Sequence, residues 1–246
     1  MSYLIDIDII DFFKDNEEYS EYKMKKYDLI VLFDIFRATS TITALKQQGI
    51  EEIYISDSVG KLLEIKSEKP EVFICGERNG IPPEGFDSGN SPKDILSTDI
   101  NSRTAYITTT NGTRSLKAFQ NNSNKFLAVS LFNIDKSANY INDNFTDGNL
   151  LFICAGTENN FSIEDYAAAS ILVNCIYRFN NLNMTDKLRA CNRLGNLYIS
   201  NTELLVEDLS SAFHAKRLEK IGKKNDVDFI LSNINSLNAL GEISIL

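Results

Sequence analysis

Residues 29–41 have the sequence LIVLFDIFRATST, and this stretch decides the fold. Five consecutive apolar residues predict a β-strand that is buried on both faces, as in a parallel sheet. The strand ends at the carboxylate of Asp34, and the guanidinium of Arg37 follows closely. A negative charge at a strand end, next to a cation and the free N–H groups of a helix start, suits a metal-bound anion such as a phosphate ester.

The residues that follow this strand predict a helix and then a second strand. The helix is expected over residues 39–48, with Thr39 or Ser40 as its N-cap and Gly49 just beyond its last turn. The second strand is expected over residues 50–56. Strand, helix and strand together predict a βαβ unit, hence parallel strands joined by a right-handed crossover.

Strands and helices alternate along the rest of the chain. Residues 14–27 predict a charged surface connection, and residues 81–94 predict a long polar loop of the kind that often carries function. The other expected strands cover residues 2–10, 72–75, 105–108, 126–130, 150–154 and 226–231. The other expected helices cover residues 59–69, 115–119, 134–142, 166–177, 186–194 and 203–221. This alternation predicts an α/β protein, layered α/β/α around a mostly parallel or mixed sheet.

Size and composition indicate an ordinary globular protein. We expect residues 1–246 to form a single functional unit, with two interlocked α/β subdomains as the alternative. Hydrophobic residues make up 43% of the chain and charged residues 24%, which is a usual balance. The net charge of −9 argues against nucleic-acid or anionic-membrane binding, so an anion site must be basic locally.

Signals for targeting and for other metal sites are few. The acidic N-terminus is unlike a signal peptide, and no apolar run approaches the roughly 18 residues of a membrane helix. Widely spaced cysteines indicate reduced thiols in a cytoplasmic protein. The chain has one histidine, His214, which excludes a His-rich zinc site and suits a structural role better than a catalytic one.

Four expected strands end in loops that carry charged and hydroxyl side chains, at residues 34–37, 77–79, 109–114 and 154–165. Ligands of open parallel sheets bind at the carboxyl ends of strands, so one sheet edge would collect these groups. Mg²⁺ needs only one or two carboxylates because it keeps several waters, and arginine binds phosphate through two hydrogen bonds. Because phosphoryl transfer needs mainly positioning and charge neutralisation, the loops predict a site for a small phosphorylated acid and a divalent metal.

Each loop also has a purely structural interpretation. Asn111-Gly112 is a strong turn signal, and Glu77-Arg78 can be a surface ion pair. Glu164-Asp165 can complement the dipole of a helix N-terminus.

Several other classes of enzyme lack their motifs in this sequence. There is no GxxxxGK(S/T), GxGxxG, GxSxG or Cys-x5-Arg pattern, which weakens the nucleotide-binding, serine-hydrolase and cysteine-phosphatase hypotheses. Phe36 stands where haloacid-dehalogenase-type phosphatases have a second aspartate.

Five motifs, taken together, resemble one enzyme family. They are DIFRATST (residues 34–41), GERNG (76–80), GFDSGNSP (85–92), TTNGTR (109–114), and CAGT with SIED (154–157 and 162–165). In this order and spacing, over roughly residues 28–230, they are similar to the motifs of the 2-phosphosulfolactate phosphatases, the Mg²⁺-dependent enzymes of coenzyme M biosynthesis. The resemblance implies hydrolysis of 2-phosphosulfolactate to sulfolactate and phosphate, and an α/β fold distinct from the better-known phosphatase folds.

The resemblance also implies which residues form the site. Asp34, Glu77 and Asp165, or its neighbour Glu164, would bind Mg²⁺ or activate the attacking water. The phosphate, carboxylate and sulfonate groups of the substrate would be bound by Arg37, Arg78 and Arg114. The rest of the pocket would consist of Thr39, Ser40, Asn90, Ser91, Thr110, Asn111, Gly112, Thr113 and Cys154.

Alternatives stay open at this point. Direct attack by water is the preferred mechanism, and a covalent aspartyl-phosphate on Asp34 is the other. The substrate can be another 2-hydroxy-acid phosphate. Alternatively, the chain can bind a small polyanion without catalysis, and such a binding protein does not need carboxylates that lie close enough to share one metal. The apolar helical faces at residues 171–177 and 204–213 suit either a core or the interface of a homo-oligomer.

Overall fold

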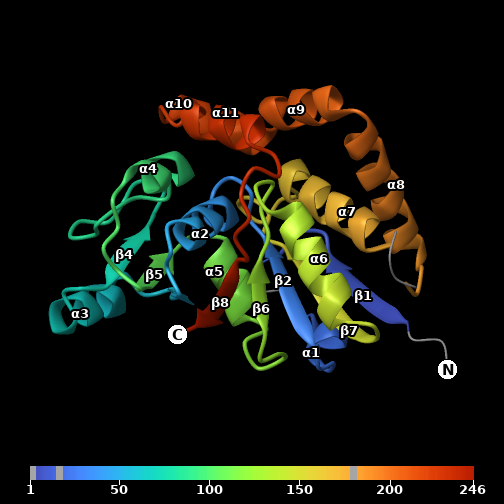
Figure 1. Cartoon of the computed structure of the whole chain (residues 1–246), viewed down its shortest axis with the longest axis horizontal. Coiled ribbons are helices and arrows are strands. Elements are labelled where there is room, and N and C mark those ends of the chain that lie inside the picture. Colours follow the sequence, from blue (N-terminus) through green and yellow to red (C-terminus); the bar gives the residue numbers. More distant parts are fainter. Residues whose placement is uncertain (1–3, 15–18, 178–181) are drawn as a thin grey trace.

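The computed structural model describes residues 4–14, 19–177 and 182–246, and within these ranges it contains eight strands and eleven helices (Figure 1). The strands are β1 (Ile5–Ile10), β2 (Leu29–Phe33), β3 (Glu52–Ile55), β4 (Phe73–Gly76), β5 (Thr104–Thr108), β6 (Phe126–Ala128), β7 (Gly148–Cys154) and β8 (Glu242–Ile245). The helices are α1 (Ser20–Lys23), α2 (Ala38–Gln47), α3 (Val59–Glu68), α4 (Pro92–Ser97), α5 (Gly112–Lys117), α6 (Ile134–Asn144), α7 (Ile163–Tyr177), α8 (Asp186–Ser200), α9 (Thr202–Ser211), α10 (Phe213–Lys220) and α11 (Lys224–Ser232). The expectation of an α/β protein is confirmed.

The eight strands form one mixed sheet in the order β1-β7-β2-β6-β8-β3-β5-β4. All neighbouring strands pair in parallel except β6 and β8, which are antiparallel, with Phe126 opposite Ile243 and Leu127 opposite Glu242. This single antiparallel pair divides the sheet into a first half (β1, β7, β2 and β6) and a second half (β8, β3, β5 and β4). Across it, the strands of the two halves run in opposite directions.

The expected parallel βαβ unit over residues 29–56 is wrong. β2 lies in the first half and β3 in the second, with β6 and β8 between them. β3 pairs instead with β8 and β5, for example through Tyr54 opposite Ser244. We expected the consecutive strands β2 and β3 to pair with each other. Instead, β2 pairs with β6 and β7, which come much later in the chain.

The strand β2 is buried on both faces, as its five apolar residues predict. Leu29, Val31 and Phe33 face a core that they share with α6–α11, while Ile30 and Leu32 face a second core. The second core also contains side chains of α2, α5, β3, β4 and β5, so α2 and α5 pack on one face of the sheet, to which both halves contribute (Figure 1). α3 packs on the opposite side of the second half. These contacts bring the ends of strands from both halves to the start of α2.

The C-terminal part differs from expectation in three places. Residues 226–231, expected to be a strand, belong to α11, because Val227, Ile230 and Leu231 are buried at the i, i+3, i+4 spacing of a helix face. The expected single helix over residues 203–221 is interrupted at Ala212, which separates α9 from α10. The short strand β8 was not expected at all.

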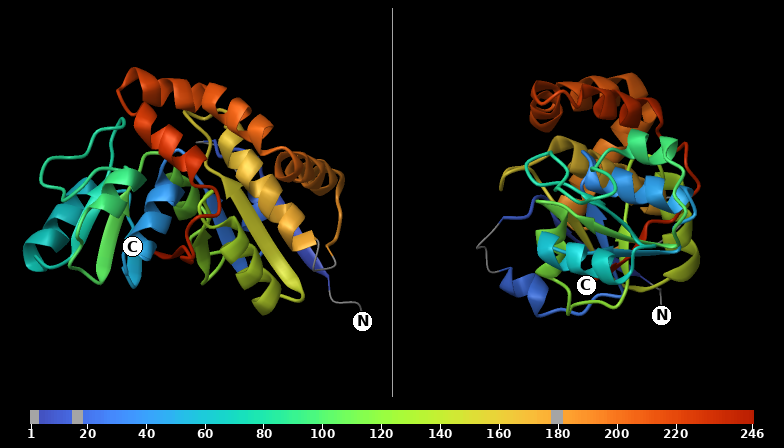
Figure 2. Two further views of the ribbon diagram at one scale, coloured as in Figure 1. Left: turned by 45° about the horizontal axis from the view of Figure 1, so that its top comes forward. Right: turned by 90° about the vertical axis from the view of Figure 1, so that its left-hand side faces the viewer.

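The helices α9, α10 and α11 lie together across one end of the molecule, above α2 and α7 (Figures 1 and 2). Two expected loops also contain short helices, α1 within residues 14–27 and α4 at the end of residues 81–94. In the described ranges, no helix combines the length and apolar composition needed to cross a membrane.

Candidate functional site

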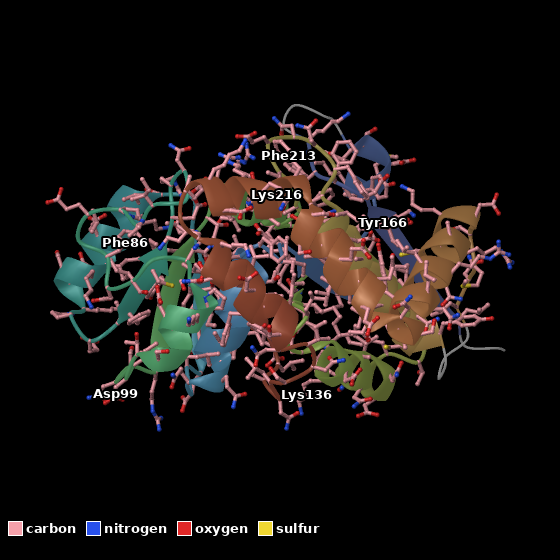
Figure 3. All side chains as sticks on the ribbon, turned by 90° about the horizontal axis from the view of Figure 1, so that it is seen from above. Phe86, Asp99, Lys136, Tyr166, Phe213 and Lys216 are labelled. Atoms are coloured by element: carbon pink, nitrogen blue, oxygen red, sulfur yellow. The ribbon has the colours of Figure 1, made fainter. Side chains whose placement is uncertain are left out.

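A cavity of about 160 Å³ lies where the ends of β2, β4 and β5 meet α10, and we call it the Asp34 pocket. Seen from above, α10 and its neighbours cover this region, with Phe213 and Lys216 of α10 at the surface (Figure 3). The pocket is lined by Asp34, Phe36, Arg37, Glu77, Asn79, Gly80, Asn90, Thr109, Thr110, Asn111, Glu158, His214, Arg217, Leu218 and Ile221.

Asp34 is buried at the end of β2, and backbone donors hold both of its carboxylate oxygens. Oδ1 accepts from the N–H of Ala38 at 3.3 Å and Oδ2 from the N–H of Gly112 at 3.0 Å. Burial raises the pKa of Asp34 to about 6, and the negative charge of Glu77 raises it as well, whereas His214 and the two N–H groups act in the opposite direction. This carboxyl group can therefore exchange a proton near neutral pH.

The start of α2 is organised differently from expectation. Arg37 occupies the N-cap position, so neither Thr39 nor Ser40 caps the helix. Both lie in the first turn, where Thr39 Oγ1 donates to the carbonyl of Asp34 at 3.0 Å and Ser40 Oγ donates to the carbonyl of Ile35 at 2.9 Å. The Asp34 side chain itself binds a free N–H of this turn, and the two hydroxyls brace its backbone rather than face the pocket.

Glu77 joins the loops that follow β4 and β5. Its Oε1 accepts from the N–H of Thr110 and its Oε2 from the N–H of Gly80, both at 2.7 Å. Because Gly112 in the same loop donates to Asp34, one segment positions both carboxylates at the pocket wall.

Glu164 and Asp165 lie in the first turn of α7, which begins three residues earlier than expected. Asp165 accepts from the N–H groups of Ile35 (2.8 Å) and Gly156 (3.0 Å), and burial raises its pKa well above the ordinary value, followed by the charges of Glu164 and Asp34. Both carboxylates lie behind the lining of the pocket. Asp165 holds the β2–α2 turn, and Glu164 faces His214.

The structure separates the three arginines that were expected to act together. Arg37 lines the pocket and pairs with buried Asp226 at 2.5 Å. Arg78 donates to the carbonyl of Asp57 and to Thr108, and Arg114 donates to Asn111, so neither belongs to the lining.

The cation that sequence reasoning missed is Arg217, which lines the pocket from α10 and pairs with Glu158 at 2.5 Å. No strand-end motif marks this helix, so only the fold could reveal it. Asn79 and Gly80, by contrast, stand within a motif that the sequence did single out.

The other expected residues divide into two groups. Asn90, Thr110 and Asn111 line the pocket. The following lie behind it: Ser91, which caps α4 and donates to Asp226; Gly112, which donates to Asp34; Thr113, which bonds to Thr109; and Cys154, buried at the end of β7.

The oxygen donors of the pocket fit a Mg²⁺ ion. Within the described residues, no group of three or more His, Cys, Asp or Glu side chains is arranged to hold a metal. Mg²⁺ needs only one or two carboxylates plus neutral oxygens and water, and Asp34 and Glu77 supply the carboxylates. Asn90 Oδ1 and Thr110 Oγ1 are buried and find no hydrogen-bond partner in the described part of the chain, so they are free to contact an ion or substrate.

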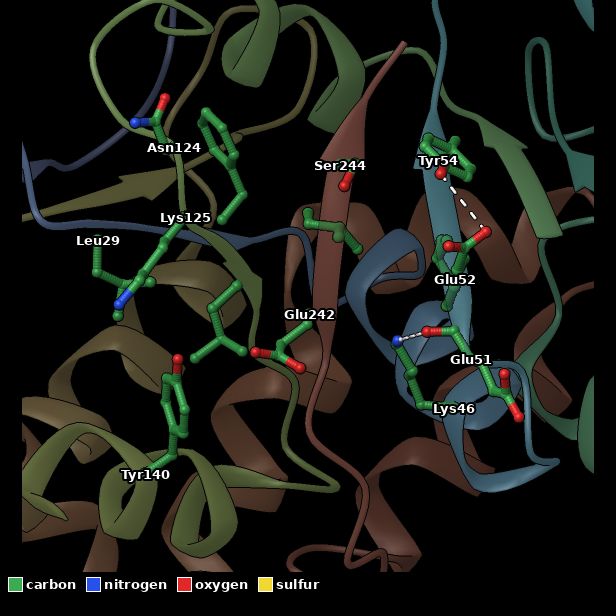
Figure 4. A pocket seen from close by; sticks show the side chains of 14 residues that line it. Leu29, Lys46, Glu51, Glu52, Tyr54, Asn124, Lys125, Tyr140, Glu242 and Ser244 are labelled. Atoms are coloured by element: carbon green, nitrogen blue, oxygen red, sulfur yellow. Dashed lines mark hydrogen bonds between the residues drawn. The ribbon is translucent and has the colours of Figure 1, made fainter. Parts of the chain in front are cut away.

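A second cavity, of about 250 Å³, lies along the β6–β8–β3 junction (Figure 4). Its labelled side chains include Lys125, Glu242 and Glu52 from the three strands and their flanks. None of the residues expected from the motifs lines it. Of these two cavities, the smaller Asp34 pocket is the one that collects residues of the motifs.

An α/β fold that places paired carboxylates, backbone donors and arginines around a small cavity suits the binding of a small phosphorylated acid. Comparison with protein families agrees: the family model described as 2-phosphosulpholactate phosphatase matches residues 14–244. The chain belongs to the 2-phosphosulfolactate phosphatase family.

Individual relatives show the same similarity. A protein of Thermotoga petrophila named "Probable 2-phosphosulfolactate phosphatase" is 34% identical over 200 residues, which cover 81% of this chain and 82% of the relative. Proteins with the same name are 30% identical over 202 residues in Thermus thermophilus (82% of each chain) and 29% identical over 224 residues in Clostridium novyi (91% of this chain and 92% of the relative).

Proposed function

We propose that this protein is a Mg²⁺-dependent phosphatase that hydrolyses 2-phosphosulfolactate to sulfolactate and phosphate, the reaction of coenzyme M biosynthesis. The observation that carries the proposal is the buried Asp34 carboxylate, held by two backbone N–H groups beside Glu77 in a pocket with free oxygen acceptors. The family membership and the names of the relatives support the same substrate.

Asp34 is the group that accepts the proton of the attacking water. Water oxygen forms a bond to phosphorus, the bond from phosphorus to the C2 oxygen breaks, and the water proton moves to the Asp34 carboxylate. Two backbone N–H groups fix this carboxylate at the wall of the pocket, where it is positioned to take the proton. Asp34 and Glu77 would hold Mg²⁺, which neutralises charge on the phosphoryl oxygens when bound.

The substrate carries three anionic groups, and the pocket offers two arginines to them. Arg37 is fixed by Asp226 at the inner wall, and Arg217 stands with Glu158 on the side of α10. We assign the phosphate to the Asp34 side with Arg37, and the sulfonate or carboxylate to Arg217. A guanidinium binds each of these groups through paired hydrogen bonds.

Phosphate release from 2-phosphosulfolactate tests the proposal, with Mg²⁺ and with excess chelator, for the wild type and Asp34→Asn. Metal-dependent release that the variant lacks supports it. A panel of other 2-hydroxy-acid phosphates measures how far the specificity extends. If none of these compounds is hydrolysed by folded protein but calorimetry detects their binding, the chain is a polyanion-binding protein and the proposal is wrong.

A further inference from the structure

His214, the single histidine of the chain, lines the Asp34 pocket from α10. Its Nδ1 lies 3.1 Å from Oε1 of Glu164 and 2.9 Å from Oγ1 of Thr157. Its ring packs edge-on against Phe36, with ring centroids 6.3 Å apart. Three contacts from three different segments thus fix the orientation of one imidazole at the pocket wall.

These contacts determine which nitrogen faces the pocket. Glu164 is 1% exposed, and its Oε1 and the hydroxyl of Thr157 both lie within hydrogen-bond distance of Nδ1, so Nδ1 is the nitrogen turned toward the protein. Nε2 has no hydrogen-bond partner among the described residues, and it is the nitrogen left for a ligand. The carboxylate of Glu164 behind the ring orients the imidazole, in the manner of the buried acid of a catalytic triad.

We propose that His214 is the proton donor to the leaving group of the hydrolysis, and that Glu164 is its positioning residue. This inference rests on the proposed function. As the bond between phosphorus and the C2 oxygen breaks, the proton on Nε2 moves to that oxygen, so that the product leaves as an alcohol. The imidazole then regains a proton from solvent, and the water proton taken by Asp34 is released separately.

The chemistry of the substrate favours such a donor. An alkoxide on C2 is a poor leaving group, and its departure is accelerated when a proton is supplied in the transition state. The arginines of the pocket stay protonated and cannot supply it, and Asp34 is committed to the attacking water. His214 enters from α10, whereas Asp34 stands at the end of β2, so acid and base come from separate walls of the pocket.

The decisive experiment compares two substrates that differ in one bridging atom. 2-Phosphosulfolactate leaves through oxygen and needs the proton, while its analogue with sulfur as the bridging atom leaves as a thiolate and does not. His214→Asn keeps an amide N–H at the position of Nδ1, toward Glu164, but has no group at Nε2. We expect kcat for the oxygen substrate to fall about 10²–10³-fold, and kcat for the sulfur analogue to fall less than about tenfold.

Two further variants separate chemistry from folding. His214→Gln places a non-acidic amide near the position of Nε2. Its kcat should fall for the oxygen substrate and much less for the sulfur analogue. Glu164→Gln should lose part of the activity toward the oxygen substrate only, because it leaves the imidazole present but less well oriented. Lys216→Gln, on the exposed side of α10, is the control and should behave like the wild type with both substrates.

Equal losses on both substrates, or no loss on either, would overturn the assignment of His214. If the wild type hydrolyses neither substrate, it is the proposed function that fails, so the two failures are distinct. Urea unfolding of each variant verifies that the compared proteins are folded.

Discussion

The guanidinium of Arg37 lies 2.5 Å from the carboxylate of Asp226, although the two residues are 189 positions apart in the chain. Both side chains are almost completely buried, at 3% and 6% exposure. The second oxygen of Asp226 accepts a hydrogen bond from Ser91, which caps α4. One carboxylate of α11 thus connects the start of α2 to α4 beside the Asp34 pocket.

Removal of this carboxylate should destabilise the protein strongly. Asp226→Ala leaves the buried charge of Arg37 without its partner, and breaking a buried pair in this way costs about 3–5 kcal/mol. Urea unfolding measures the loss. Asp228→Ala, two residues away on α11 with an exposed carboxylate near Lys224, should change the free energy of unfolding by less than about 0.5 kcal/mol. If both substitutions lower the free energy of unfolding by a similar amount, the Arg37–Asp226 pair does not have the stabilising role described.

The raised pKa of Asp34 predicts how stability depends on pH. Burial lifts this pKa from 3.8 to about 6, so the folded protein holds a proton that the unfolded chain releases. Ionising the buried Asp34 carboxyl group lowers the free energy of unfolding. This loss is absent below about pH 4 and complete above about pH 6. Between pH 7 and pH 4 the wild type should therefore gain about 3 kcal/mol relative to Asp34→Asn, since one pKa unit is worth about 1.4 kcal/mol. A difference in unfolding free energy that is constant over this range would refute the assignment.

Glu77 should control the requirement for Mg²⁺. Glu77→Gln removes one of the two carboxylates that fit the ion while keeping a side chain of similar size. We expect the Mg²⁺ concentration for half-maximal phosphate release to rise by about 10–100-fold. Glu84→Gln, an exposed position in the following loop, is the control and should keep the wild-type value. An unchanged requirement in Glu77→Gln would place the metal elsewhere.

The close approach of Gly112 to Asp34 predicts a substitution that impairs activity through geometry. A Cβ at position 112 would stand 2.9 Å from Asp34 Oδ2 and 3.3 Å from Thr109 Oγ1. Gly112→Ala must therefore displace the Asp34 carboxylate, and we expect kcat to fall about 10–100-fold. Gly60→Ala in α3, where the new Cβ meets only Ser58 Oγ at 4.0 Å, should keep full activity and gain about 0.5–1 kcal/mol of stability. The phosphate-release rates of Gly112→Ala and Gly60→Ala, each compared with the wild type, test this prediction.

Local sequence patterns predicted the α/β class and most of the strands and helices, but not the order of the strands in the sheet. The apolar run before Asp34 is strong enough to specify a doubly buried strand, and the segments around it alternate in the same clear way. Two of the elements that escaped prediction, α11 and β8, have ambiguous patterns. Val227 and Phe229 alternate like a strand over a few residues, whereas burial in α11 follows the helical spacing. The four residues of β8 are too short to stand out, and they form a strand because two other strands offer them partners.

The site was predictable where it depends on strand ends, and not where it depends on long-range packing. Asp34, Glu77 and Thr110 stand next to apolar strands, and all three line the pocket. The direction of the Arg78 and Arg114 side chains could not be inferred, because it is set by acceptors such as the carbonyl of Asp57 and the amide oxygen of Asn111. Arg217 joins the pocket only because the C-terminal helices fold back over the sheet (Figure 2).

The place of β8 in the sheet has a consequence for biosynthesis. β8 joins the two halves, yet it begins 88 positions after the end of β7, at Glu242 compared with Cys154. At about 5–20 residues per second, a ribosome needs roughly 4–18 s to make this interval. During that time the facing edges of β6 and β3 present unpaired backbone groups, which other strands can bind. At this stage a nascent chain therefore has unpaired strand edges in the middle of its future sheet, not only at its borders.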